Sequence, residues 1–381
     1  MVRKVVFWIH LISGLVAGAV IAVMSVTGVA IAFEEEILAW CDREVRRIEP
    51  ASPGAGPLSL EQLRDKARGD RPDFDVDYIV VPRDANLAYE LFAKREGPLY
   101  ADPNTGTLRD SRAHGVHEVL HELEEWHRWL GMHGEGMATG KLITGICNLA
   151  FLLLCVTGLY LWFPRTWSGR ALRPRLWLAG HYKGKAREFN WHNVFGLWSL
   201  PVLLMLAATA VVISFGWAHR LVFTLAGEEA PKSRNFGMMA VPPPQVPTPD
   251  AGAPRLPMDQ LLARAQGEVP DWRTIGVRFP SDADVAKAAP VKLEVMRDDT
   301  MPSRAYVPVE LDPFTGEVLQ AVRFEDRSPG LRARVWIRFL HTGAGFGLTG
   351  KIVVTLATLA SLILVYTGFA LSWRRFAARR R

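Results

Sequence analysis

The chain has 381 residues, with 45 Lys and Arg side chains against 39 Asp and Glu, and 49% of its residues are apolar. This composition excludes a disordered chain and a collagen-like one. The three cysteines are Cys41, Cys147 and Cys155, which are too few for a disulfide-rich scaffold or a four-cysteine zinc site.

Four uncharged runs are each long enough to cross a bilayer, which takes about 20 apolar residues. They are residues 5–33, 142–164, 189–219 and 352–373. The first run ends in an Ala-Ile-Ala sequence at 30–32, which resembles a signal-peptide cleavage site. Its apolar stretch is about twice the usual signal-peptide core of at most ~15 residues, so we predict an uncleaved helix. The sequence therefore predicts four membrane helices in contact with lipid.

Basic residues indicate the orientation of these helices, because Lys and Arg collect on the cytoplasmic side. The loop 165–188 has seven Lys and Arg and one Glu, and the tail 374–381 has five Arg. The N-terminus contributes Arg3 and Lys4, whereas the segment 34–140 has 22 acidic and 13 basic residues. We predict that both termini are cytoplasmic and that 34–140 lies outside.

Several motifs recur at a fixed spacing. The sequence Asp-Pro-x-Thr-Gly at 102–106 returns at 312–316, and Thr-Gly at 157–158 returns at 367–368, both at an offset of 210. In the first and third predicted helices, His10, Gly14 and Thr27 match His192, Gly196 and Thr209 at an offset of 182. Constant offsets of this kind indicate internal duplication.

Each outside segment is typical of a small α+β domain. Helix-like stretches at 58–68 and 258–266 precede alternating strand-like segments such as 78–81 and 305–309. In both outside segments, the Asp-Pro-x-Thr-Gly motif is predicted to form a turn that leads to another strand. A proline-rich stretch at 241–254 indicates an extended linker. The predicted fold is an internally duplicated membrane bundle of four helical spans with two outside α+β domains. Its predicted segments are helix 1 (1–33), outside domain 1 (34–125), helix 2 (126–164), a basic cytoplasmic loop (165–188), helix 3 (189–219), outside domain 2 (220–333), helix 4 (334–373) and a cytoplasmic tail (374–381).

The depth of the histidines is informative, because an ionisable side chain in a membrane is costly and often functional. His10 and His192 lie near the cytoplasmic ends of the first and third helices, each followed by a glycine four residues later. A single such histidine is often only an interfacial side chain bonded to backbone or lipid. Because the histidine recurs with its glycine, we predict that the two imidazoles hold one haem iron from both sides.

A second pair is expected at the outer ends of the second and fourth helices. His341 precedes the fourth helix, and either His127 or His133 could be its partner. At the offset of 210, the position equivalent to His341 is residue 131. His127 lies four residues before it, one helical turn away on the same face, and we favour His127 as the partner. His133 remains the alternative, because the glycine-rich sequence at 131–136 could break the helix.

A competing motif lies at 117–121. His117, Glu118 and His121 match H-E-x-x-H, in which two histidines bind zinc and the glutamate activates water. His114 extends the same helix face, but acidic residues follow at once, as on an exposed charged helix. The motif leaves open a zinc-dependent protease, a solvated helix, or a histidine-rich and acidic face that handles Fe(II).

The chain resembles the PepSY-associated transmembrane family, which includes bacterial inner-membrane siderophore reductases. The matching stretches are Trp-Ile-His-Leu-Ile-Ser-Gly-Leu at 8–15, Trp-His-Arg-Trp-Leu at 126–130, Trp-His-Asn-Val-Phe-Gly at 191–196, Leu-His-Thr-Gly at 340–343 and the Thr-Gly endings at 157–162 and 367–373. The resemblance implies a di-haem ferric-siderophore reductase of the ferrioxamine type. It assigns His10, His127, His192 and His341 as ligands of two haem b groups. The family's basic residue after the first histidine is replaced by Leu11, and Asn193 stands at the equivalent place.

The resulting hypothesis is an oxidoreductase of the bacterial inner membrane, with PepSY-like periplasmic domains, that passes electrons to a periplasmic ferric siderophore and releases Fe(II). A cytoplasmic or membrane-bound donor would supply the electrons, and we expect no nucleic-acid partner. Two alternatives are the zinc protease and a non-enzymatic binding or regulatory membrane protein.

Overall fold

The computed structural model describes residues 1–49, 56–93, 96–231, 244–247, 253–298, 300–303 and 305–377. These residues form two compact units, each built from segments distant in the chain. The first unit combines residues 1–34, 119–230 and 336–381, and the second combines 35–118 and 231–335. Of the predicted linker at 241–254, residues 244–247 and 253–254 carry no helix or strand, and the rest lie outside the described residues.

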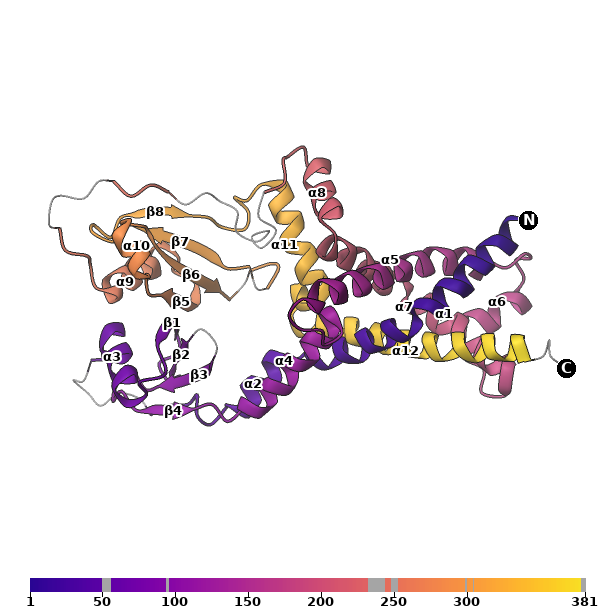
Figure 1. Cartoon of the computed structure of the whole chain (residues 1–381), viewed down its shortest axis with the longest axis horizontal. Coiled ribbons are helices and arrows are strands. Elements are labelled where there is room, and N and C mark those ends of the chain that lie inside the picture. The colour runs from indigo at the N-terminus through magenta and orange to yellow at the C-terminus, as the bar shows by residue number, and fades with distance from the viewer. Residues whose placement is uncertain are drawn as a thin grey trace. The chain divides into compact units, whose positions relative to one another are not determined.

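Four long apolar helices make up most of the first unit, and all four are long enough to cross a membrane. Their bounds are α1 (Val2–Ile31), α5 (Gly136–Trp162), α7 (Gly184–Ser214) and α12 (Gly347–Ala377). They lie side by side, with α1 and α7 each packed against both α5 and α12 (Figure 1). The four predicted spans are therefore present, and the chain is a membrane protein.

Several polar side chains inside this bundle are paired with one another or with backbone. The hydroxyl oxygens of Ser25 in α1 and Ser361 in α12 are hydrogen-bonded at 2.8 Å. Glu188, which the sequence places just before the third span, lies inside α7 and is buried. Its carboxylate accepts two 2.8 Å hydrogen bonds from Arg374 of α12. Such pairs satisfy polar groups that lipid cannot solvate.

Short helices precede the second and fourth spans. They are α4 (His114–Trp129) before α5, and α11 (Pro329–Thr342) with the 3₁₀ turn η2 (Ala344–Phe346) before α12. The chain reverses between α4 and α5 at residues with positive φ, namely Leu130, Gly131 and Gly134. The predicted second span 126–164 is thus interrupted, as the glycine-rich sequence allows. Other short helices are α2 (Glu34–Cys41), α6 (Gly169–Leu176), α8 (Gly216–Leu225) and α10 (Asp282–Ala286).

The second unit contains an antiparallel sheet of eight strands in the order β4-β3-β2-β1-β5-β6-β7-β8. The strands of the first segment are β1 (Val76–Pro82), β2 (Tyr89–Ala93), β3 (Glu96–Ala101) and β4 (Leu108–Asp110). Those of the second segment are β5 (Trp272–Arg278), β6 (Val291–Arg297), β7 (Val307–Leu311) and β8 (Val318–Ala321). Strand β1 pairs with β5, with Val80 opposite Gly276, so the two segments share one sheet. The sequence predicts two separate domains here, and the shared sheet makes them one unit.

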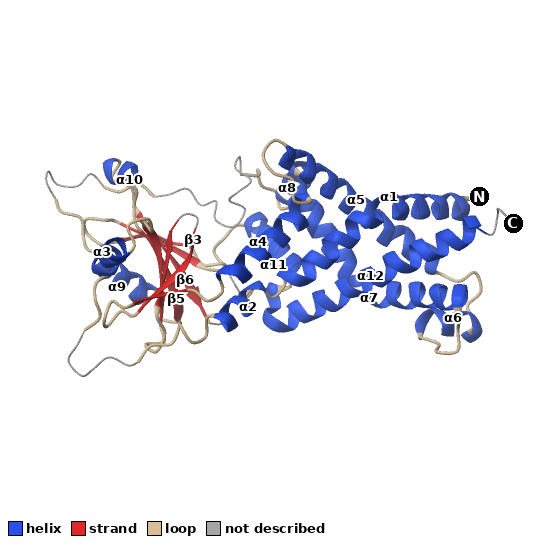
Figure 2. Cartoon of the chain, turned by 60° about the horizontal axis from the view of Figure 1, so that its bottom comes forward, coloured by secondary structure: helices blue, strands red, loops and turns tan. Residues whose placement is uncertain are grey.

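Helices α3 (Leu60–Asp70) and α9 (Met258–Glu268) pack on this sheet (Figure 2). Their inward residues, including Leu63 and Leu261, join inward residues of the strands, including Ile79 and Ile275, in one core. The helices also cap each other. The Asp259 carboxylate accepts from the Leu60 amide at 3.1 Å, and the Glu61 carboxylate accepts from the Met258 amide at 2.6 Å. A carboxylate at a helix N-terminus satisfies an unpaired N–H and complements the helix dipole.

The repeated Asp-Pro-x-Thr-Gly motif forms a tight turn in both segments. Gly106 and Gly316 both have φ of +71°, a conformation that favours glycine, and each donates its N–H to the carbonyl of the first Asp of its motif. The Asp side chain accepts from the amide two residues later, as in Asn104 and Phe314. The turns lead into β4 and β8, which confirms the predicted strands after them.

Candidate functional site

Four histidines of the first unit make the same contact with a neighbouring helix. In each case the imidazole Nδ1 lies within hydrogen-bond distance of a threonine Oγ1. The pairs are His10–Thr157 (2.9 Å), His192–Thr367 (2.9 Å), His127–Thr27 (3.2 Å) and His341–Thr209 (3.1 Å). The four predicted ligand histidines are thus held by one recurring arrangement.

The hydrogen bonds of these threonines define which imidazole nitrogen carries the proton. Each hydroxyl donates to the carbonyl four residues earlier in its own helix, at 2.7 to 2.8 Å. Each Oγ1 therefore accepts from the histidine, and Nδ1 is the donor. Two backbone carbonyls, which only accept, support this assignment: Met24 O lies 2.9 Å from Nδ1 of His127, and Leu206 O lies 3.3 Å from Nδ1 of His341.

With Nδ1 protonated, Nε2 of each neutral imidazole keeps its lone pair. This tautomer is the one that binds a metal, and a hydrogen bond at the second nitrogen fixes the ring orientation. The threonines were not recognised from the sequence as functional. Their signal was present, because Thr27 and Thr209 recur at the offset of the histidines and Thr157 and Thr367 recur in the Thr-Gly endings.

His10 of α1 and His192 of α7 face each other inside the helical bundle. Their ring centroids are 6.3 Å apart and the ring planes are nearly perpendicular, at 87°. Two imidazoles that bind one metal ion through nitrogens about 2 Å from it have centroids about 6 Å apart. The spacing of this inner pair therefore fits a shared metal ion.

His127 and His341 form the outer pair, on α4 and α11. Both are held in the same way, His127 by Thr27 of α1 and His341 by Thr209 of α7. His127 is the histidine held by Thr27, whereas His133 lies in the turn after α4 and its side chain is 64% exposed. The structure thus gives His127, the favoured candidate, the same threonine contact as His341.

Glycines adjoin three of the four rings. The Cε1 atoms of His10, His127 and His192 lie 3.2, 3.0 and 3.8 Å from where a Cβ would stand on Gly158, Gly28 and Gly368. Each glycine follows the threonine that binds the ring, and Ala210 stands at the fourth position. The glycines four residues after His10 and His192 instead face leucines, Leu154 and Leu364. The small residue beside each ring therefore comes from the neighbouring helix.

The H-E-x-x-H motif lies on the exposed face of α4. His114 Nε2 is 3.4 Å from a Glu118 carboxylate oxygen, and these side chains are 72% and 68% exposed. Side-chain atoms that could bind a metal converge further along the chain, where those of Glu122, Glu125 and His133 all lie within 4.8 Å of one another. This arrangement favours a solvated, charged helix at 117–121 over a buried zinc centre.

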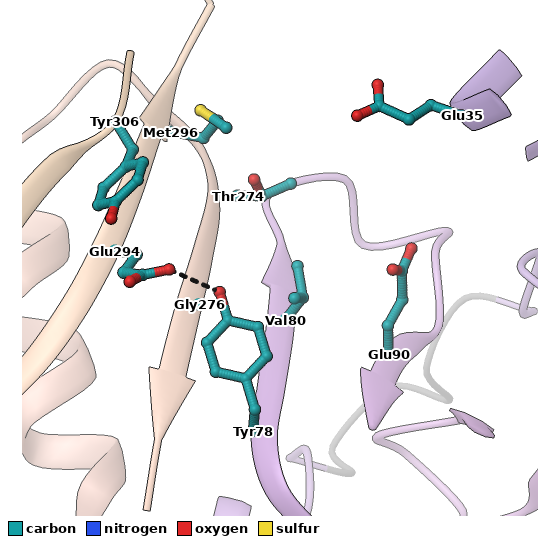
Figure 3. Close-up of a pocket in the computed structure, with 9 residues that line it drawn as sticks. All are labelled: Glu35, Tyr78, Val80, Glu90, Thr274, Gly276, Glu294, Met296 and Tyr306. Atoms are coloured by element: carbon teal, nitrogen blue, oxygen red, sulfur yellow. Dashed lines mark hydrogen bonds between the residues drawn. The ribbon is translucent and has the colours of Figure 1, made fainter. Parts of the chain in front are cut away.

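The second unit has a cavity of about 350 Å³ on the sheet where β1 meets β5 (Figure 3). Its lining is acidic and phenolic, with Glu35, Tyr78, Glu90, Glu294 and Tyr306 among the lining residues. The Tyr78 hydroxyl donates to Glu294 at 3.1 Å (Figure 3). The Tyr78 ring crosses Gly276, where a Cβ would meet the phenol oxygen at 1.8 Å. Glycine at 276 is therefore required for the Tyr78–Glu294 contact.

Burial raises the pKa of Tyr78 above its usual value of 10.0, and Glu294 adds to the shift. Because the folded state holds this proton more tightly than the unfolded state, the stabilisation is complete below pH 10 and is lost as pH rises above it. We expect the free energy of unfolding to fall more steeply above pH 10 in the natural protein than in Tyr78→Phe. Urea unfolding at a series of alkaline pH values measures this, and equal slopes would contradict it.

Four apolar helices together with a soluble antiparallel sheet define a membrane protein with a folded domain outside the bundle. The PepSY-associated TM region family matches residues 7–375, and the chain belongs to this family. It is also 26% identical over 147 residues to the uncharacterized protein PA4219 of Pseudomonas aeruginosa. That match spans 39% of this chain and 36% of the relative.

Proposed function

We propose that this protein carries electrons across the bacterial inner membrane through two haem b groups and reduces a ferric siderophore in the periplasm. The observation that supports it best is the fourfold repetition of a histidine whose Nδ1 is engaged by a threonine. It is joined by the 6.3 Å spacing of the inner pair. Family membership agrees with a membrane protein of this architecture.

Each bound haem would supply an iron that accepts and releases one electron. His10 and His192 would hold the inner iron, and His127 and His341 the outer one. Neutral imidazoles add no charge to the apolar bundle, and their hydrogen bonds to threonine keep the rings oriented in both oxidation states. Little rearrangement is then needed when an electron arrives, which favours transfer.

The substrate is proposed to be a chelate of Fe(III) outside the membrane. One electron converts Fe(III) to Fe(II), which oxygen ligands hold less tightly because the ion is larger and less charged. The second unit, with its acidic and phenolic cavity, is the proposed docking region for the chelate. A cytoplasmic or membrane-bound donor would supply the electrons, with the termini on the cytoplasmic side.

The proposal is tested by purifying the full-length protein and recording its reduced-minus-oxidised spectrum. We expect b-type α and β bands, and two haems per chain by the pyridine haemochrome method. The reduced protein should then reoxidise on addition of a ferric siderophore, with Fe(II) captured by a ferrous-specific dye. Folded protein from haem-supplied cells that lacks haem would refute the proposal.

Replacement of a threonine tests the recurring contact. Thr367→Val keeps the side-chain shape and removes the acceptor for Nδ1 of His192, whereas Thr367→Ser keeps a hydroxyl. Loss of a hydrogen bond to the second nitrogen of a ligand histidine weakens metal binding by about 10- to 100-fold. We therefore expect weaker haem retention in Thr367→Val and near-normal retention in Thr367→Ser. Haem transfer to apomyoglobin measures retention, and equal loss from both variants would contradict this role.

A further inference from the structure

One group of metal-binding side chains takes no part in the proposed haem sites. It consists of His121, Glu122 and Glu125 of α4, and His133 of the turn that follows. His121 and Glu125 are four residues apart, and Glu122 and Glu125 are three apart, so the three side chains share one face of the helix. The group therefore combines two imidazoles with two carboxylates from two segments of the chain.

The turn after α4 brings His133 back to the helix. Leu130 and Gly131 both have positive φ, and the Gly131 amide donates to the carbonyl of Glu125, which ends the helix and reverses the chain. His133 Nδ1 then lies 3.4 Å from Oε2 of Glu125. The backbone thus sets the fourth side chain against the other three.

Glu125 is the centre of the group. His121 Nε2 lies 3.7 Å from its Oε1 while His133 lies near its Oε2, so each carboxylate oxygen faces an imidazole. The Glu125 side chain is only 16% exposed, whereas His121 and His133 are 61% and 64% exposed and have room to adjust. Ligand atoms of Glu122, Glu125 and His133 already lie within 4.8 Å of one another. A small closure of exposed side chains would bring them to coordination distance.

Ion pairing alone is the simpler explanation of these contacts. Glu122, however, brings a second carboxylate to the group, and the ligand atoms of Glu122, Glu125 and His133 lie within 4.8 Å of one another, where two like charges favour a cation between them. Two imidazoles beside two carboxylates are a ligand set for a divalent metal. Mixed nitrogen and oxygen donors select Fe²⁺, Mn²⁺ or Zn²⁺ over Ca²⁺ and Mg²⁺, which prefer oxygen alone.

We propose that His121, Glu122, Glu125 and His133 bind a divalent transition-metal ion, and that its physiological ligand is the Fe(II) released by reduction of the chelate. The identity of the ion as Fe(II) rests on the proposed function, while the metal site rests on its own side chains. Glu125 lies two residues before His127 on the same helix, so the site lies within one helical turn of the proposed outer haem ligand. It would receive Fe(II) close to where the electron leaves the protein.

The test uses untagged, full-length, haem-loaded protein in detergent, dialysed anaerobically against Fe(II) alone and, separately, Mn(II) alone. We expect one metal ion per chain in addition to haem iron. Glu125→Gln and His133→Gln should each weaken binding by at least about 10-fold. The matched controls Glu118→Gln and His117→Gln, on the same helix, should bind as the natural protein does. His133 is exposed, so its variant tests the site even if Glu125→Gln does not fold.

Wild-type protein that binds no extra ion would overturn the proposal, as would controls that lose binding as much as the site variants do. Haem content is measured on the same samples, which separates the metal-site proposal from the electron-transfer proposal. Normal haem without extra metal rejects this site alone. Extra Mn(II) in protein without haem rejects the electron-transfer function and leaves the metal site standing.

Discussion

Replacing His192 by alanine is expected to reduce the haem content from two groups per chain to one. The change removes the His192 imidazole, whose ring centroid lies 6.3 Å from that of His10, so one axial ligand of the proposed inner haem is lost. His10→Ala should have the same effect, and the double variant should still hold the outer haem. Pyridine haemochrome measurements on protein of known concentration give the count.

Equivalent changes at His127 and His341 should remove the outer haem and leave the inner one. Ferric-siderophore reduction should then fall to the background rate in all four variants, because the path for electrons is broken on one side or the other. His181→Ala is the matched control, since this exposed histidine lies in the loop before α7. Retention of two haems in a His192→Ala sample would exclude the proposed ligation.

Replacing Asp42 by alanine is expected to destabilise the second unit strongly. The buried Asp42 carboxylate accepts hydrogen bonds from the Tyr100 hydroxyl at 2.9 Å, the Ser111 hydroxyl at 2.7 Å and the amides of Arg112 and Ala113 at 2.7 and 3.1 Å. Alanine leaves these donors without their acceptor. We expect the free energy of unfolding to fall by about 2 to 4 kcal/mol, since each unsatisfied buried donor costs about 1 to 3 kcal/mol and water satisfies some of them.

Pulse proteolysis across a urea series measures this loss in the full-length protein. Asp73→Ala serves as the control, because Asp73 is an exposed carboxylate in the same unit. An unfolding midpoint in Asp42→Ala equal to that of the control would show that the four hydrogen bonds contribute little.

The membrane helices and the histidines on them could be predicted because their signals are local. Uncharged length identifies a span wherever its neighbours lie, and His10 and His192 recur with the same flanking residues. The Asp-Pro-x-Thr-Gly turns were equally local, since one glycine with positive φ and one Asp side chain define them. Features that depend on a few consecutive residues were therefore correctly predicted.

Contacts between distant segments could not be predicted in the same way. Thr27 binds His127 only because α4 returns to α1, and periodicity within one helix carries no information about its partner. Whether His127 or His133 lies beside Thr27 depends on where α4 ends, which the positive φ values of Leu130 and Gly131 mark. Pairing of β1 with β5 joins strands from opposite halves of the chain. The sequence of either strand alone fits the edge of a sheet as well as its centre, so it does not indicate this partner.

The junction of β1 and β5 closes an edge of the sheet that either half alone would leave open. A half-length protein with only β1 to β4 and α3 would expose the free edge of β1, which tends to pair with another strand. Two copies could join at that edge around a twofold axis, each helix supplying the acidic residue that the other needs at its start, as Glu61 and Asp259 do. In this chain β5 occupies that edge, so the same contact lies in the middle of one sheet.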